Sequence, residues 1–244
     1  MIELIRTILR PNPIERPEIK DIVGKCKEIL EKIKKENEEK ENKENDEKKD
    51  ENDKEKKENM KNKLYDNGEY KGEMENDKRE GYGEFYYKNG DIYKGDWKND
   101  LRNGNGTYLY KCGHKYEGQW INDVKEGKNS TFYYNNDNKY EGEFKKNLRY
   151  GKGKFTYNNG DIYEGDFKDN EMEGIGILKK ENGDTYDGEW KNGEFSGQGK
   201  YTYKNGDVYE GEFKDGNKHG KGILTKKSDG EKLEGRWEND EFRN

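Results

Sequence analysis

The chain has 244 residues, of which 43% are charged and 26% are hydrophobic, and its formal net charge is −6. The hydrophobic share lies far below the roughly 45–50% of an ordinary globular domain, which excludes a large two-layer core. No apolar run reaches the ~18 residues of a membrane-spanning helix, and no basic patch of the kind expected in a nucleic-acid binder is visible.

Residues 1–30 are predicted to form a short helical segment. Leu4, Ile5, Ile8 and Leu9 share one helical face, and the run 11–13, Pro-Asn-Pro, ends that helix. A second helix is predicted to begin near residue 17, because proline suits a first helical turn. Apolar residues then recur every three or four positions as far as residue 33.

The same segment, about residues 2–26, resembles the end of a eukaryotic protein-kinase domain. The resemblance depends on the aliphatic residues before position 10 and on the motif Asn12-Pro13-Ile14-Glu15-Arg16-Pro17. It implies a structural role for Arg16 and Pro17, because the matching arginine in kinases pairs with the glutamate of an Ala-Pro-Glu motif. The alternative is a stand-alone amphipathic helical hairpin.

No kinase phosphate loop, strand lysine, catalytic loop or Asp-Phe-Gly motif accompanies the resemblance. The chain as it stands is therefore expected not to be an enzyme, and we assign no catalytic, cofactor-binding or metal-binding residues. A longer parent protein, of which this chain would be the C-terminal fragment, could be a serine/threonine kinase.

Residues 31–63 are predicted to be a charged linker rich in lysine, glutamate and asparagine. Such a composition has almost nothing to bury, so we expect a solvated spacer that is partly helical or disordered. Cys26 and Cys112 lie far apart in sequence, which predicts no disulfide framework and favours a cytoplasmic location.

Residues 64–244 repeat one 23-residue pattern. Counted from a first tyrosine at position zero, the pattern has glycine at positions 2, 11 and 13 and aromatic residues at positions 4 and 15. This alternation with period two predicts a β-hairpin in each unit and an antiparallel meander overall. The units begin at Tyr70, Tyr93, Tyr116, Tyr140, Tyr163, Tyr186 and Tyr209, and a partial unit begins at Leu233.

The spacing also predicts the register of each hairpin. If positions that sum to 15 face each other, Tyr93 lies opposite Tyr108, Gly95 opposite Gly106, and Trp97 opposite Gly104. Glycines would then face glycines or rings, which cover their bare backbone.

The connection between units needs an odd number of residues to keep the rings on one face. Asn89-Gly90-Asp91 suits a three-residue loop with a positive φ at Gly90. In the third unit Asn129 replaces the second glycine and one residue is inserted before Tyr140, which predicts a local break in register.

Residues 64–244 resemble the MORN repeat (membrane occupation and recognition nexus). The resemblance implies a mostly β, elongated, single-layer antiparallel meander without catalytic function, which organises assemblies near membranes or the cytoskeleton and can dimerise. The repeat-defining residues of the clearest units are Tyr93, Gly95, Trp97, Gly104, Gly106, Tyr108, Tyr140, Gly142, Phe144, Tyr163, Gly165, Phe167, Tyr186, Gly188, Trp190, Tyr209, Gly211 and Phe213.

We therefore expect a scaffold for protein–protein interaction, with an unknown protein or a second copy as partner. A ring face left partly exposed on a thin sheet, and an open edge at the partial last unit, would both favour association. A peripheral phospholipid-binding module is the second alternative. Net charge does not favour it, and acidic residues such as Glu141 and Glu143 are better explained as cross-strand partners of Lys154 and Lys152.

Overall fold

The computed structural model of this protein describes residues 31, 34 and 61–243. The predicted helical segment, with Arg16 and Pro17, lies outside the described residues. So does most of the predicted linker, although Glu31 and Lys34 are helical. The first strand begins at Lys61, shortly before the predicted start of the repeats at residue 64.

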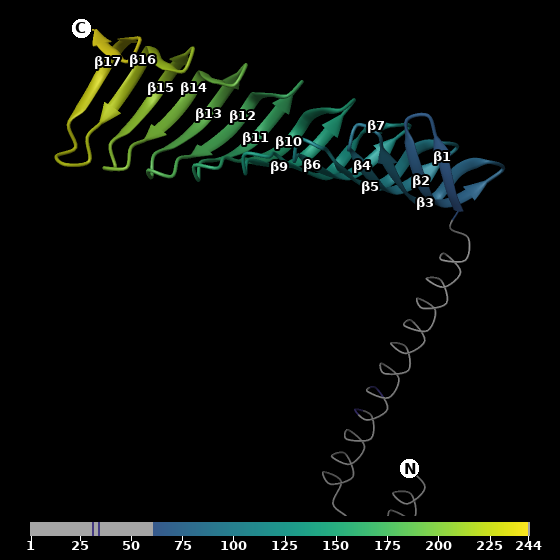
Figure 1. The fold of residues 1–244 in the computed structure, drawn as a ribbon. Coiled ribbons are helices and arrows are strands. Elements are labelled where there is room, and N and C mark those ends of the chain that lie inside the picture. The colour runs from purple at the N-terminus through teal and green to yellow at the C-terminus, as the bar shows by residue number, and fades with distance from the viewer. Residues whose placement is uncertain (1–30, 32–33, 35–60, 244) are drawn as a thin grey trace, which may run out of the picture. The chain divides into compact units, whose positions relative to one another are not determined.

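The repeats form one open antiparallel sheet in which strands follow one another in chain order, and Figure 1 shows it twisting along its length. This confirms the predicted mostly β meander of hairpins. Each strand pairs with its neighbours in sequence, except that the short β7 pairs only with β6, so β6 also pairs with β8. The eighteen strands within residues 61–243 are β1 (Lys61–Tyr65), β2 (Gly68–Glu75), β3 (Lys78–Tyr87), β4 (Ile92–Lys98), β5 (Leu101–Leu109), β6 (Lys115–Ile121), β7 (Val124–Lys125), β8 (Gly127–Tyr133), β9 (Lys139–Lys145), β10 (Leu148–Thr156), β11 (Ile162–Lys168), β12 (Glu171–Lys179), β13 (Thr185–Lys191), β14 (Glu194–Thr202), β15 (Val208–Lys214), β16 (Asn217–Thr225), β17 (Lys232–Glu238) and β18 (Glu241–Arg243).

The loop between units is the predicted three-residue turn, placed one residue earlier. The Tyr87 N–H donates to the Asp91 carbonyl at 3.0 Å and the Gly90 N–H to the Tyr87 carbonyl at 2.9 Å, so the loop is Lys88–Gly90. Gly90 has φ 94°, as predicted for a bulge-type turn. Phe85 lies directly opposite Tyr93, which confirms that the odd loop keeps both rings on one face.

A second turn within each unit was not recognised in the sequence. Asn99 and Asp100 both have positive φ, 49° and 71°, as the central residues of a two-residue type I′ turn require. This turn places Trp97 opposite Arg102, so the predicted pairing of Trp97 with Gly104 is wrong.

The pairings of Gly95 with Gly106 and of Tyr93 with Tyr108 are confirmed. The two registers are joined by a bulge between Gly95 and Trp97, where residues 103–105 lie opposite a single residue, Asp96. The bulge arises because the type I′ turn is centred one residue earlier than the predicted register requires.

The first-position tyrosines and the rings at position 4 form a continuous core. Tyr93 is fully buried and meets Trp97 of its own unit edge-to-face at 5.1 Å and Trp120 of the next unit at 5.5 Å. Its hydroxyl donates to the Asp96 carbonyl at 3.0 Å. Such edge-to-face contacts are the preferred geometry of aromatic pairs.

The expected partly exposed ring face is confirmed only in part: neighbouring units bury the rings at positions 0 and 4, whereas rings such as Tyr87 and Tyr110 are half-buried. Trp237 in the partial last unit is also core: it is 5% exposed, and its indole N–H donates to the Gly222 carbonyl at 3.2 Å. The edge strand β18 is three residues long and carries Glu241 and Arg243. Short, charged edges disfavour strand pairing with another chain. The expectation that the open edge at the partial last unit favours association is therefore not supported.

The glycines at positions 2 and 13 allow the tyrosine ring to lie on the sheet. A Cβ on Gly106 would lie 2.3 Å from the Tyr93 hydroxyl oxygen, and one on Gly95 would lie 2.4 Å from the Gly106 Cα. Both distances are shorter than any real contact, so the ring needs a bare backbone beneath it.

Substituting one of these glycines tests this packing. In Gly176→Ala the new Cβ would lie 2.5 Å from the Tyr163 ring, so we expect the free energy of unfolding to fall by roughly 2 kcal/mol, as overpacking usually does. Chemical denaturation measures it. The matched control is Ile175→Ala, whose side chain is 54% exposed, and an equal effect of both substitutions would contradict the packing argument.

The third unit shows the predicted break in register. The pairing of β8 with β9 shifts between Gly127 and Ser130, and Ser130 lies opposite Gly142. Ser130 is 2% exposed, and its hydroxyl shares a 3.0 Å hydrogen bond with that of Tyr116. The inserted residue thus lets a serine, held by a hydrogen bond, take the place of the missing glycine.

Candidate partner-binding face

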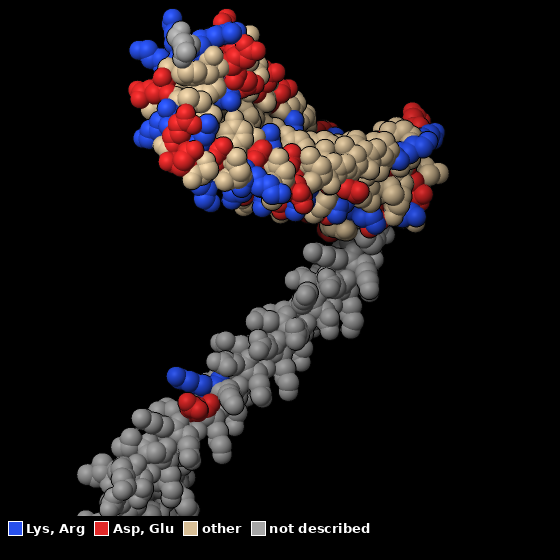
Figure 2. Space-filling view, turned by 90° about the vertical axis from the view of Figure 1, so that its left-hand side faces the viewer, with Lys and Arg blue, Asp and Glu red and all other residues tan. Residues whose placement is uncertain are grey.

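The sheet has two chemically different faces. We call the side that carries Tyr93, Trp97 and Tyr108 and their equivalents the ring face, and the opposite side the outer face. In the view of Figure 2, acidic and basic side chains are interspersed over the surface. A single-sign basic surface suited to anionic lipid is not seen from this side.

The acidic residues of the outer face have structural partners. Lys154 lies opposite Glu141 as predicted, although its ammonium forms an ion pair with Glu164 at 3.6 Å. The predicted pairing of Glu143 with Lys152 is wrong, because the bulge places Tyr150 opposite Glu143. The Glu143 carboxylate instead accepts the backbone N–H of Lys152 at 3.4 Å.

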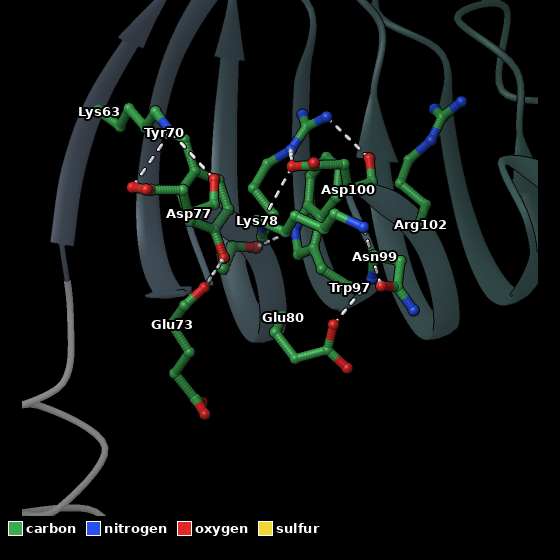
Figure 3. Close-up of polar contacts among 12 residues, drawn as sticks. Lys63, Tyr70, Glu73, Asp77, Lys78, Glu80, Trp97, Asn99, Asp100 and Arg102 are labelled. Carbon is green, nitrogen blue, oxygen red and sulfur yellow. Dashed lines mark hydrogen bonds and ion pairs between the residues drawn. The ribbon is translucent and has the colours of Figure 1, made fainter. Parts of the chain in front are cut away.

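Position nine of each unit carries a row of side chains along the ring face. In the first unit the Arg79 guanidinium lies 4.2 Å above the Trp97 ring and donates from Nε to Asp100 Oδ1 at 3.1 Å. The Arg79 backbone N–H donates to the same carboxylate oxygen at 2.9 Å. Figure 3 shows Asp100 and Trp97 at this contact, which we call the clamp.

The clamp joins position nine of one unit to position seven of the next, in the type I′ turn. Arg102 repeats it in the second unit: its Nε donates to Asp123 Oδ1 at 2.7 Å, and the guanidinium lies 4.3 Å from the Trp120 ring. The clamp therefore ties neighbouring hairpins together and neutralises the arginine with a carboxylate from the same chain.

The next two clamps lack the carboxylate. Lys125 and Arg149 occupy position nine, but their turn partners are Asn147 and Asn170, whose side-chain oxygens accept only the backbone N–H groups, at 2.8 and 2.9 Å. No ion pair to either cation is present within residues 61–243. Neither positive charge is therefore paired with a carboxylate in the described part of the chain, although the Arg149 guanidinium still donates from Nη2 to the Asn170 carbonyl.

These two cations are surrounded by rings. Lys125 Nζ lies 5.0–5.1 Å from the ring centres of Tyr110, Tyr116 and Phe132. Burial lowers the pKa of Lys125 to about 8, and the charge of Arg102 acts in the same direction. Arg149 Nε is buried and has no hydrogen-bond partner among the described residues.

The row then becomes apolar. Met172 and Phe195 occupy position nine, and their turn partners are Gly193 and Gly216. Phe195 stacks on Tyr186 with ring centres 3.8 Å apart. A hollow of about 320 Å³ opens here, and its lining includes Tyr157, Met172, Leu178, Lys180, Trp190 and Phe195.

The clamp partly returns in the last full unit. The Lys218 backbone N–H donates to Asp240 Oδ1 at 2.9 Å, and its ammonium lies 4.7 Å from the Trp237 ring. Along the row, a cation at position nine occurs with aspartate or asparagine in the next turn, whereas Met172 and Phe195 occur with glycine. The two positions change together, as expected of residues that contact each other.

A second row of half-buried rings lies beside the first. These rings occupy position seventeen of their units, or position eighteen in the third unit. Each packs on the ring two residues before it in the chain, with ring centres 4.5–4.7 Å apart. Aromatic side chains with a polar tip are enriched where proteins contact partners. The members of this row are Tyr87, Tyr110, Tyr134, Tyr157 and Tyr203.

Sequence reasoning missed both the clamp and its loss. The signal was available as basic residues at position nine in phase with aspartate or asparagine at position seven. The repeat-defining residues, from Tyr93 to Phe213, lie in the core or in the backbone against which it packs, and they position this face. His114 has a structural contact, because its Nδ1 accepts the Asn135 N–H at 2.9 Å.

Comparisons with known proteins identify the repeat. The MORN-repeat family model matches residues 70–92, 93–113, 116–128, 140–162, 163–185, 186–208 and 209–230. The sequence finds no match among curated proteins. Within the described residues, no helix is long and apolar enough to cross a membrane.

Two solved structures are similar to this chain at low identity. One is the SAS-4 (dCPAP) TCP domain of Drosophila melanogaster in complex with a proline-rich motif of Ana2, at 14% identity and a TM-score of 0.40, covering 73% of this chain and 90% of that one. The other is the Danio rerio CPAP TCP10 domain in complex with a STIL peptide, at 11% identity and a TM-score of 0.25, covering 73% and 99%.

Proposed function

The chain belongs to the MORN-repeat family, and from that premise we propose that it is a non-catalytic scaffold that binds a protein partner along its ring face. The observation that carries the proposal is the change in the row at position nine. Two clamped arginines are followed by two uncompensated cations and then by an apolar hollow. A row that served only to join hairpins would have no reason to lose its clamps in the middle.

The half-buried tyrosines beside this row support a protein partner. Half-buried rings supply contact area at little entropic cost, and tyrosines are enriched at protein interfaces. Phospholipid is less favoured, because the row intersperses cations with rings and its first two arginines are already paired with Asp100 and Asp123. We place the scaffold in the cytoplasm, near a membrane or the cytoskeleton.

A second copy of the chain is the other partner considered. The short, charged β18 disfavours pairing through that edge, so association of two copies would have to use the ring face. Light scattering over a concentration series separates the cases, since a single copy has a mass of 28.9 kDa. A mass that doubles with concentration would identify the second copy as the partner.

Photo-crosslinking tests the scaffold proposal. A photoreactive phenylalanine replaces Tyr157 on the ring face or, as matched control, Tyr82 on the outer face, which is 39% exposed. The full-length proteins are then irradiated in an extract of the source cells. We expect a defined protein crosslinked at position 157 and absent at position 82. Crosslinks only at position 82, or only to lipid, would contradict a ring-face scaffold.

A further inference from the structure

The unpaired cations and the apolar hollow are neighbours on one face. Lys125, Arg149, Met172 and Phe195 occupy position nine of four successive units. Each unit adds two strands at ~4.8 Å each, so Arg149 and Phe195, two units apart, are separated by roughly 19 Å along the row. An extended segment spans this with about six residues and a helix with about thirteen.

The chain itself shows what an unpaired cation at this position binds. Arg79 and Arg102 are each held by an aspartate side chain, at 3.1 and 2.7 Å from Nε. Lys125 and Arg149 occupy equivalent places, and asparagine stands where that aspartate would be. Partly buried charges without a carboxylate partner are unfavourable. A carboxylate from another chain could therefore form the ion pair with Lys125 or Arg149 that this chain does not supply.

The hollow supplies the second half of the site. Where the clamp is replaced by Met172–Gly193 and Phe195–Gly216, neither the guanidinium nor the aspartate is present to fill the space. The lining combines Met172, Leu178, Trp190 and Phe195 with the charged residues Asp161, Lys180 and Glu194. Burial of an apolar side chain there would remove both it and the lining from water.

We propose that the ring face binds a partner segment whose acidic side chains pair with Lys125 and Arg149 and whose apolar side chain fills the hollow at Met172 and Phe195. This rests on the proposed scaffold function and adds the chemistry of the partner. A lipid phosphate could bind the cations, but it would leave unexplained why position nine becomes apolar in the next unit, at Met172.

The chain offers variants that restore the clamp. Asn147→Asp with Asn170→Asp gives Lys125 and Arg149 the carboxylates that Asp100 and Asp123 give their equivalents. Phe195→Arg with Gly216→Asp rebuilds a clamp across the hollow. An aspartate at position 216 fits the backbone, because Gly216 has φ 80°, close to the 71° of Asp100, and a Cβ there would meet nothing within 4 Å.

The experiment selects random peptides of roughly 16 residues, long enough to reach from Arg149 to Phe195 as a strand or a helix, on the full-length chain. We expect enriched peptides that carry aspartate or glutamate together with a large apolar residue. Fluorescence anisotropy with a synthetic enriched peptide should show affinity at least about tenfold weaker in each restored-clamp variant, the loss expected for one charge-assisted contact or one buried apolar side chain. The outer-face control Lys152→Gln with Lys154→Gln should bind like the parent.

Folding is checked by circular dichroism and thermal melting, and the Asn147→Asp, Asn170→Asp variant should melt at or above the parent temperature. Enriched peptides without acidic residues, equal affinity in the variants, or no enrichment at all would overturn the inference. The inference would also be overturned if the chain bound phosphatidylserine vesicles and no peptide, and if the restored-clamp variants lost that vesicle binding. If peptides of other chemistry are selected while crosslinks at position 157 persist, this inference fails and the scaffold proposal stands.

Discussion

Raising the pH above about 10, the ordinary pKa of tyrosine, is expected to unfold the repeats in one steep transition. The first-position tyrosines are all fully buried. Burial raises the pKa of Tyr116 and Tyr209 to about 12 and raises those of Tyr70, Tyr93, Tyr140, Tyr163 and Tyr186 further. Ionising such a phenol inside the fold would place a charge among rings.

Stability falls as the pH rises, because the folded and unfolded states bind the phenol proton with different pKa values. The folded-state pKa lies above the unfolded value, so the stabilisation is fully present below pH 10 and is lost as the pH rises toward the folded-state pKa. A pKa of about 12 against 10.0 in the unfolded chain corresponds to roughly 2–3 kcal/mol lost by pH 12 for a single group. Seven such groups together exceed the 5–15 kcal/mol that typically stabilises a folded protein.

The measurement is a pH titration that follows phenolate absorbance and the circular dichroism of the sheet together. We expect both to change in the same narrow interval, because the buried phenols ionise only when the hairpins open. Tyr163→Phe is the matched variant: it keeps the ring, loses the 2.9 Å hydrogen bond to the Asp166 carbonyl, and should move the alkaline midpoint upward. Gradual ionisation with the sheet signal intact at pH 12 would contradict this.

The sequence predicted the fold in detail because period-two alternation and the spacing of the glycines are direct consequences of strand geometry. The pairings of Tyr93 with Tyr108 and of Gly95 with Gly106 followed from spacing alone. The type I′ turn was missed because Asn-Asp is a weaker turn signal than Asn-Gly, although both residues tolerate positive φ. Missing it shifted the predicted partner of Trp97 and concealed the bulge at Asp96.

The ring face was harder to predict because its burial depends on contacts between units. Alternation says which side Tyr93 occupies, but only the assembled row shows that Trp97 and Trp120 enclose it. The candidate site had a further obstacle: it is formed by departures from the pattern. The turn positions that matter hold asparagine or glycine where the clamped units hold aspartate: Asn147, Asn170, Gly193 and Gly216. Their contacts with position nine can be seen only in the structure.

Removal of one core tyrosine is expected to divide the sheet. Tyr163 is fully buried, lies 5.2 Å from Phe167 in its own unit and 4.8 Å from Trp190 in the next, and donates its hydroxyl to Asp166. Tyr163→Ala deletes both ring contacts and leaves a cavity above Gly176. Removing a large buried ring usually lowers the free energy of unfolding by about 3–5 kcal/mol. Each unit of a repeat protein contacts only its neighbours, so the loss falls on a single junction.

The consequence is a change in cooperativity as well as in stability. With the junction at Tyr163 weakened, β1–β10 and β13–β18 no longer stabilise each other, and urea denaturation should show two transitions where the parent shows one. Tyr82→Ala is the control, because its ring is 39% exposed on the outer face and should change the free energy of unfolding by less than about 0.5 kcal/mol. A single transition in Tyr163→Ala, at the parent midpoint, would mean that the rings are not what couples one hairpin to the next.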